Sequence, residues 1–203
     1  MVNSPAELAT RLEQSVKQLR GTGDDAALLA AARAAADQVE QHLGAQHDGA
    51  REALKVIQRL TFNVAADCWP GWSVSDKPIE PDNLLAAREL AERSLGLVRT
   101  LELGPMREGT GIWLVGAFDL ALGRYDEAIR ILRDARQHYV AASAPGLVLL
   151  TDGYVVIARQ LEGQVSADGE GLDQVCARIA AGGFKDRDAW IVQLRTAFDV
   201  FAR

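Results

Sequence analysis

Apolar side chains recur every three or four positions along most of the chain, which is the period of an α-helix. Near the start, four of them follow one another at steps of four, four and three residues: Leu8, Leu12, Val16 and Leu19. Ser4 and Pro5 precede this stripe as an N-cap and a proline at the first helical position. The pattern predicts a first helix that ends near Arg20.

The same period continues in further segments, separated by glycine, proline or polar residues. The predicted helices cover about 24–43, 50–68, 82–103, 108–122, 125–142, 145–161, 172–181 and 186–202. Two longer breaks interrupt them, a proline-rich loop over 70–82 and a glycine-rich loop over 163–171. Because the other connections are short, consecutive helices are expected to be antiparallel and to stack as hairpins.

Composition strengthens the all-α prediction and indicates where in the cell the protein is expected. The chain has 203 residues, of which 48% are hydrophobic, 25% charged and only 6% aromatic, while alanine, the best helix former, is plentiful. The start of the chain lacks the charged head and apolar run of a leader, and the longest apolar runs are too short to span a bilayer. Cys68 and Cys176 form no C-x-x-C motif. We therefore expect a cytoplasmic protein with reduced thiols and no membrane partner.

Net charge argues against a nucleic-acid partner. The formal charge is −6 and the pI is about 5.1, whereas a general nucleic-acid binder normally carries a basic surface.

One segment carries a more specific pattern, made of small, aromatic and large apolar residues at fixed offsets. Its members are Gly116, Gly123, Tyr125, Ala128, Leu132 and Ala135. They predict two helices whose backbones approach closely, with Gly116 and Ala128 at the contact. The segment resembles one unit of a tetratricopeptide repeat (TPR). It departs from that repeat at Ile112, Asp119 and Val140, where the family usually has tryptophan, an aromatic residue and proline.

The resemblance implies a short α-solenoid of stacked hairpins. Residues 1–49 would form an N-terminal helical hairpin, 50–183 the TPR-like hairpins and 184–203 a C-terminal capping helix, all within a single domain over 1–203. The alternative is a non-repetitive helical bundle that contains one TPR-like hairpin. TPR proteins usually hold another protein, so the resemblance implies an adaptor or scaffold without catalysis.

In TPR proteins the first helix of each hairpin lines a groove. Here the helix over 108–122 would present Trp113 and four further apolar residues: Leu114, Ala117, Leu120 and Ala121. It lacks the lysine, arginine and asparagine with which chaperone-binding TPRs hold a terminal carboxylate. The groove would therefore suit an amphipathic helix, or would be covered by the terminal helices of the same chain.

A second candidate surface lies at the end of the helix over 50–68. Arg59, Asn63 and Asp67 follow one another at intervals of four, and Trp69 and Trp72 come directly after them. Because tryptophan and arginine dominate interface hot spots, we predict a protein-binding edge at Arg59, Asn63, Trp69 and Trp72, together with Trp113 of the groove. The alternative is a solvated helix face whose tryptophans pack the loop onto the hairpin.

The sequence offers little for catalysis, cofactors or metals. Asp119 and Asp152 interrupt apolar helices, and we expect ion pairs with Arg124 and Arg159. His42 and His47 do not share a helix face, and His138 stands alone, so no metal site is predicted. Phosphate-binding and dinucleotide-binding motifs are also absent, so no cofactor is expected.

Three hypotheses about function follow. The first is a non-catalytic protein-interaction module that binds a protein or peptide. The second is an enzyme with a site between the third, fifth and seventh helices that uses Asp67, Asp119 or Arg59. The third is a structural protein whose apolar groove closes a homodimer.

Overall fold

The computed structural model describes residues 4–43, 49–74, 80–163 and 171–202. Within these ranges the chain forms nine α-helices and one 3-10 helix, and no β-strand, so the all-α prediction is confirmed. The α-helices are α1 (Pro5–Lys17), α2 (Asp25–His42), α3 (Ala50–Asp67), α4 (Pro81–Thr100), α5 (Pro105–Ala121), α6 (Tyr125–Ala141), α7 (Pro145–Leu161), α8 (Leu172–Ala181) and α9 (Arg187–Phe201). The 3-10 helix is η1 (Pro70–Trp72).

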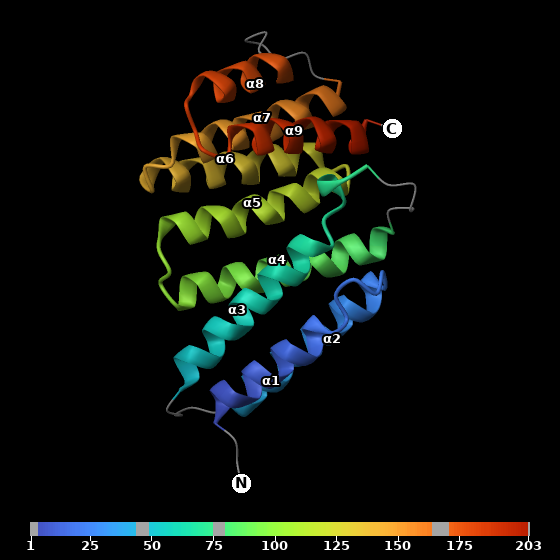
Figure 1. Ribbon diagram of the computed structural model, residues 1–203, viewed down its shortest axis with the longest axis vertical. Coiled ribbons are helices and arrows are strands. Elements are labelled where there is room, and N and C mark those ends of the chain that lie inside the picture. Colours follow the sequence, from blue (N-terminus) through green and yellow to red (C-terminus); the bar gives the residue numbers. More distant parts are fainter. Residues whose placement is uncertain (1–3, 44–48, 75–79, 164–170, 203) are drawn as a thin grey trace.

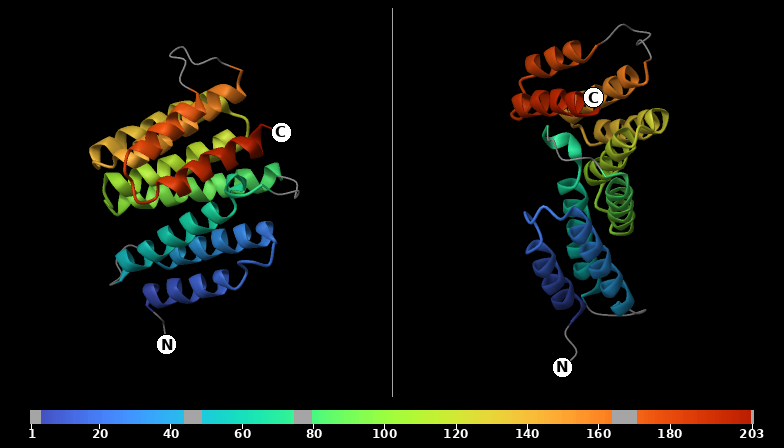
Figure 2. Two further views of the ribbon diagram at one scale, coloured as in Figure 1. Left: turned by 45° about the horizontal axis from the view of Figure 1, so that its top comes forward. Right: turned by 90° about the vertical axis from the view of Figure 1, so that its right-hand side faces the viewer.

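The helices stack in chain order along the long axis of the molecule (Figure 1). From α3 to α8 each helix packs against the next one, while α1 contacts α2 and α3, and α2 also contacts α4. Helix α9 packs against α8 and also returns across the stack to contact α7 and η1 (Figures 1 and 2). The architecture is thus a helical-repeat arrangement of antiparallel neighbours, as expected from the short connections.

Four predicted bounds need correction. The first helix ends at Lys17 rather than near Arg20. The fifth helix begins at Pro105 rather than at 108, because Gly104, with a φ of 85°, breaks the chain and proline is favoured in the first turn. Pro81 likewise opens α4, because proline is favoured in the first turn of a helix. The proline-rich segment over 70–82 is therefore not one irregular loop, since its first residues form η1 and its last two belong to α4.

The hairpin of α5 and α6 has the close contact that its glycine predicted. A Cβ atom added to Gly116 would lie 3.0 Å from Leu132 Cγ and 3.1 Å from Ile131 Cγ2. The atoms nearest to Gly116 therefore belong to residues about one helical turn beyond Ala128, where we had placed the contact. Most residues of α5 are buried, which makes it the central helix of the stack.

Within the described ranges, no helix combines the length and the apolar content that crossing a bilayer requires.

Candidate functional site

Five aromatic side chains gather where η1, α5, α7 and the end of α9 meet. We call them the aromatic cluster: Trp69, Trp72, Trp113, Tyr154 and Phe201. Trp69 is its centre, because its ring centroid lies 4.9 Å from Trp72, 5.7 Å from Tyr154 and 6.0 Å from Phe201. Residues that are far apart in the sequence are thus joined in one packed group.

The backbone around η1 directs Trp69 inward. Trp69 is extended, with φ −78° and ψ 121°, because the following Pro70 disfavours a helical conformation at that position. Its ring folds back over Gly71, where any Cβ atom would overlap it. The indole Nε1–H then donates to the carbonyl of Ala117 on α5, at 3.1 Å.

Only one of the three predicted tryptophans offers a surface. Trp69, predicted on the binding edge, is 1% exposed, and Trp113, predicted in the groove, is 7% exposed, so both lie in the core. Trp72 is 43% exposed, and its Nε1–H donates to the carbonyl of Ala66. Val74, two residues later, is also exposed. The surface part of the predicted site is therefore Trp72 with Val74.

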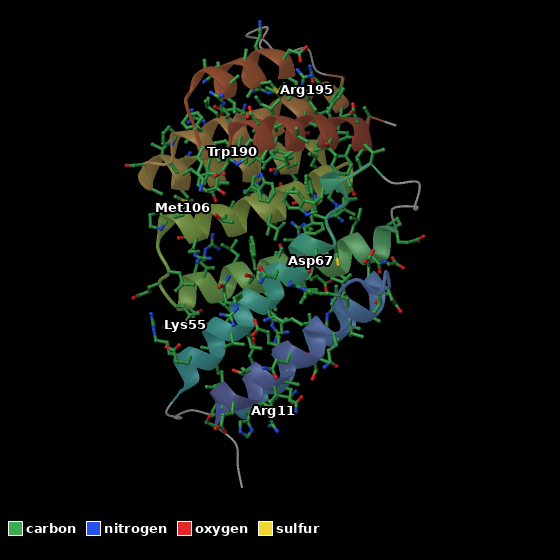
Figure 3. All side chains as sticks on the ribbon, viewed as in Figure 1. Arg11, Lys55, Asp67, Met106, Trp190 and Arg195 are labelled. Atoms are coloured by element: carbon green, nitrogen blue, oxygen red, sulfur yellow. The ribbon has the colours of Figure 1, made fainter. Side chains whose placement is uncertain are left out.

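The polar residues of α3 mainly serve to hold α1. Arg59 donates from Nε and Nη2 to the two carboxylate oxygens of the buried Glu13, at 3.0 and 3.1 Å. At the other end Asp67, labelled in Figure 3, pairs with Arg20 at 2.8 Å. Asn63 lies between these pairs and is half-buried. The predicted polar ladder thus contacts α1 through Arg59 and the turn that follows α1 through Asp67.

The two carboxyl groups of these ion pairs, Glu13 and Asp67, have altered pKa values. Burial would raise the pKa of Glu13, but the hydrogen bonds and charges of Arg59 and Lys17 outweigh it and hold the pKa below its ordinary value. Burial also acts on Asp67, where it outweighs the nearby Arg20 and raises the pKa.

The groove predicted along α5 is covered by the chain itself. Leu114, Ala117 and Leu120 are buried, and Trp69, which precedes η1, donates a hydrogen bond to the carbonyl of Ala117. Phe201 at the end of α9 in turn lies beside Trp69. This face of α5 is therefore buried, but by Trp69 directly, and the terminal helix α9 reaches it only by way of Trp69.

The two interior acids are in ion pairs, as expected, but with other partners. Asp119 is fully buried and accepts two hydrogen bonds from Arg88 of α4, at 2.8 and 3.0 Å, with Arg124 at 3.5 Å. The expected Arg124 pair is therefore present, but Arg88 makes the closer contact. Asp152 pairs with Arg136 of α6 at 2.8 Å, not with Arg159.

The residues of the enzyme hypothesis are each engaged separately. Arg59 is held by Glu13, Asp67 by Arg20, and Asp119 by Arg88. Trp69, Trp113 and Tyr154 of the aromatic cluster pack against one another where α5, η1 and α7 meet. Cys68 and Cys176 are not joined by a disulfide bond, and the described residues contain no group of three or more potential metal ligands. His47 lies outside the described residues.

Sequence reasoning missed the residues that seat α9. On α7 and α9 they form two contacts: Gly146 lies against Trp190, and Gly153 lies against Leu194. The two glycines stand seven residues apart within an apolar helix, and that spacing was the one available signal of a close helix contact.

Comparison with protein-family models, with curated proteins and with solved structures finds no match to this chain.

Proposed function

We propose that this chain is a non-catalytic protein-interaction module of TPR type, acting in the cytoplasm. The fold that supports this function is a stack of helical hairpins with short connections. Such stacks provide extended surfaces from elements that are held rigid by their neighbours. The acidic surface balance favours a protein or peptide partner over a nucleic acid.

One observation carries the proposal, namely that Trp72 is both fixed and exposed. Its ring rests on Trp69 at a centroid distance of 4.9 Å, and its indole N–H is hydrogen-bonded to the backbone. Nevertheless 43% of its surface, and 47% of that of Val74, faces solvent. A large side chain that is already ordered loses little entropy on binding, which is the property of an interface anchor.

A site-specific photo-crosslinker tests this surface. We would replace Val74 with a photoreactive amino acid and irradiate the protein in extracts of its native cells, using Val140 of α6 as a matched exposed apolar control. The expected result is a discrete adduct from position 74 and none from position 140. An adduct of twice the mass of the chain would instead favour the homodimer hypothesis.

The captured partner then allows a quantitative test with Trp72→Ala. Loss of a central tryptophan typically costs about 2 kcal/mol, which is an approximately thirtyfold loss of affinity. Melting curves of the same variant provide the control for folding. If the melting temperature falls while affinity stays unchanged, Trp72 is a structural anchor and the proposed surface is wrong.

A further inference from the structure

Helix α9 is seated on the stack through side chains that enter glycine notches on α7. A Cβ atom added to Gly153 would lie 2.5 Å from Leu194 Cδ1, and one added to Gly146 would overlap the ring of Trp190. Figure 3 shows Trp190 at the start of α9. Each notch therefore accepts one knob of α9 and would be blocked by any larger residue.

The remaining contacts extend this pattern along one face of α9. Gln193 Nε2 donates to the hydroxyl of Tyr154 at 2.8 Å, Ala197 is fully buried, and Phe201 lies beside Trp69. The apolar contact positions 190, 194, 197 and 201 recur at steps of four, three and four, which places them on a single helix face. This is the arrangement in which a groove recognises an amphipathic helix.

Helix α9 is held less extensively than its neighbours. Of its 15 residues only Leu194 and Ala197 are fully buried, whereas α7 buries nine of its 17 residues. Its outer face is open, with Val192 63% exposed, and Asp186 at its N-terminus makes no side-chain cap. Elements with few buried contacts open at lower free energy than the core of a protein.

With α9 in place, one buried hydrogen-bond donor still has no acceptor. The indole Nε1–H of Trp113 is shielded from solvent and has no acceptor among the described residues. Trp113 belongs to the aromatic cluster, which α9 reaches through Phe201 beside Trp69. A helix that brings an acceptor to this point would gain an interaction that α9 does not make.

We propose that the face formed by η1 and α7 binds an amphipathic helix of a partner protein, and that α9 occupies this face as a competing internal ligand. The partner helix carries an aromatic residue, a leucine, a small residue and a second aromatic residue at the spacing of Trp190, Leu194, Ala197 and Phe201. This inference rests on the proposed interaction function and names its partner class and its regulation.

A peptide of residues 187–201, labelled with a fluorophore, is the probe. The full-length protein would be compared with Leu194→Glu, which places a charge in the Gly153 notch, and with Val192→Glu, which places the same charge on the exposed face of α9. Because docked α9 blocks the face, the apparent affinity of the protein for the peptide is proportional to the fraction of molecules in which α9 is undocked. We expect the peptide to bind Leu194→Glu at least about tenfold more tightly than wild type or Val192→Glu.

Two controls make the result decisive. A peptide with serine in place of Trp190, Leu194 and Phe201 should not bind any of the proteins. Phe201→Ala, a milder change at the end of α9, replaces Leu194→Glu if circular dichroism shows that the latter is unfolded. Equal binding of the probe to wild type and to the folded variants, or no binding at all, overturns the proposal.

The remaining outcome is exchange of α9 between copies. Light scattering would reveal a concentration-dependent dimer of Leu194→Glu that the peptide dissociates, and this would replace the partner protein with a second copy of the chain. The test is independent of crosslinking from Val74. If the probe fails while position 74 captures a partner, the interaction function stands and only the helical partner class is wrong.

Discussion

The ion pair at Asp119 permits the sharpest test of how this stack is held together. We predict that Asp119→Ala strongly destabilises the protein. The carboxylate is fully buried and joins α5 to α4 through two hydrogen bonds from Arg88, at 2.8 and 3.0 Å. Removing it leaves the guanidinium of Arg88, whose side chain is only 17% exposed, without its main partner.

The magnitude follows from this burial. Breaking a buried ion pair by deleting one partner costs about 3–5 kcal/mol, because the remaining charge stays desolvated. We expect the lower end, about 3 kcal/mol, since Arg88 keeps a hydrogen bond to Glu92 at 2.8 Å. For a chain of this size such a loss lowers the melting temperature by about 6–12 °C.

Asp152→Ala is the matched control. It makes the same substitution inside a helix and breaks the pair with Arg136, but the side chains of that pair are 21% and 42% exposed. Exposed pairs contribute about 0–1 kcal/mol. Urea unfolding at neutral pH, followed by circular dichroism, measures both variants. If Asp119→Ala costs no more than Asp152→Ala, the buried pair does not hold α4 to α5 as we have argued.

Three further predictions concern packing, pH and thiol access. Gly116→Leu should overpack the contact with Leu132 and cost about 1–3 kcal/mol. Gly96→Leu is the control, because Gly96 has no neighbour within 4 Å; replacing a helical glycine there should stabilise the protein by about 0.5–1 kcal/mol. Equal urea midpoints for the two variants would refute the contact assigned to Gly116. The pKa of Glu13 is lowered in the fold, so its contribution is present above pH 4.5 and is lost as pH falls through the folded pKa. The stability difference between wild type and Glu13→Gln should therefore shrink in acid, and a difference that does not change with pH would contradict this. The buried Cys176 should react with a thiol reagent only as urea unfolds the chain, so rapid labelling of the native protein would show that its site is open.

The helices were predictable because their signals are local. An apolar stripe such as Leu8, Leu12 and Val16 needs no knowledge of the rest of the chain, and the structure has a helix in each predicted place. Two of the errors lie at prolines, since Pro81 and Pro105 read as breakers but stand in the first turn of a helix, where the missing N–H costs nothing.

The candidate site was less predictable because its partners are remote in sequence. Trp69 looked like a surface residue beside a rigid turn, yet it is buried by Tyr154 and Phe201, which follow it by more than 80 residues. The partner of Asp119 was sought nearby at Arg124, whereas Arg88 stands 31 residues earlier. Neither contact leaves a periodic signal along the chain.

The contact between Trp69 and Phe201 also has a consequence for synthesis of the protein. Most helices pack on a neighbour in the chain and can fold as soon as that neighbour has left the ribosome. The aromatic cluster cannot close until position 201 has emerged, 132 residues after position 69. At about 5–20 residues per second this interval lasts about 7–26 seconds. Throughout that time Trp69 lacks its Phe201 contact, so the nascent chain presents part of the cluster to chaperones before α9 docks.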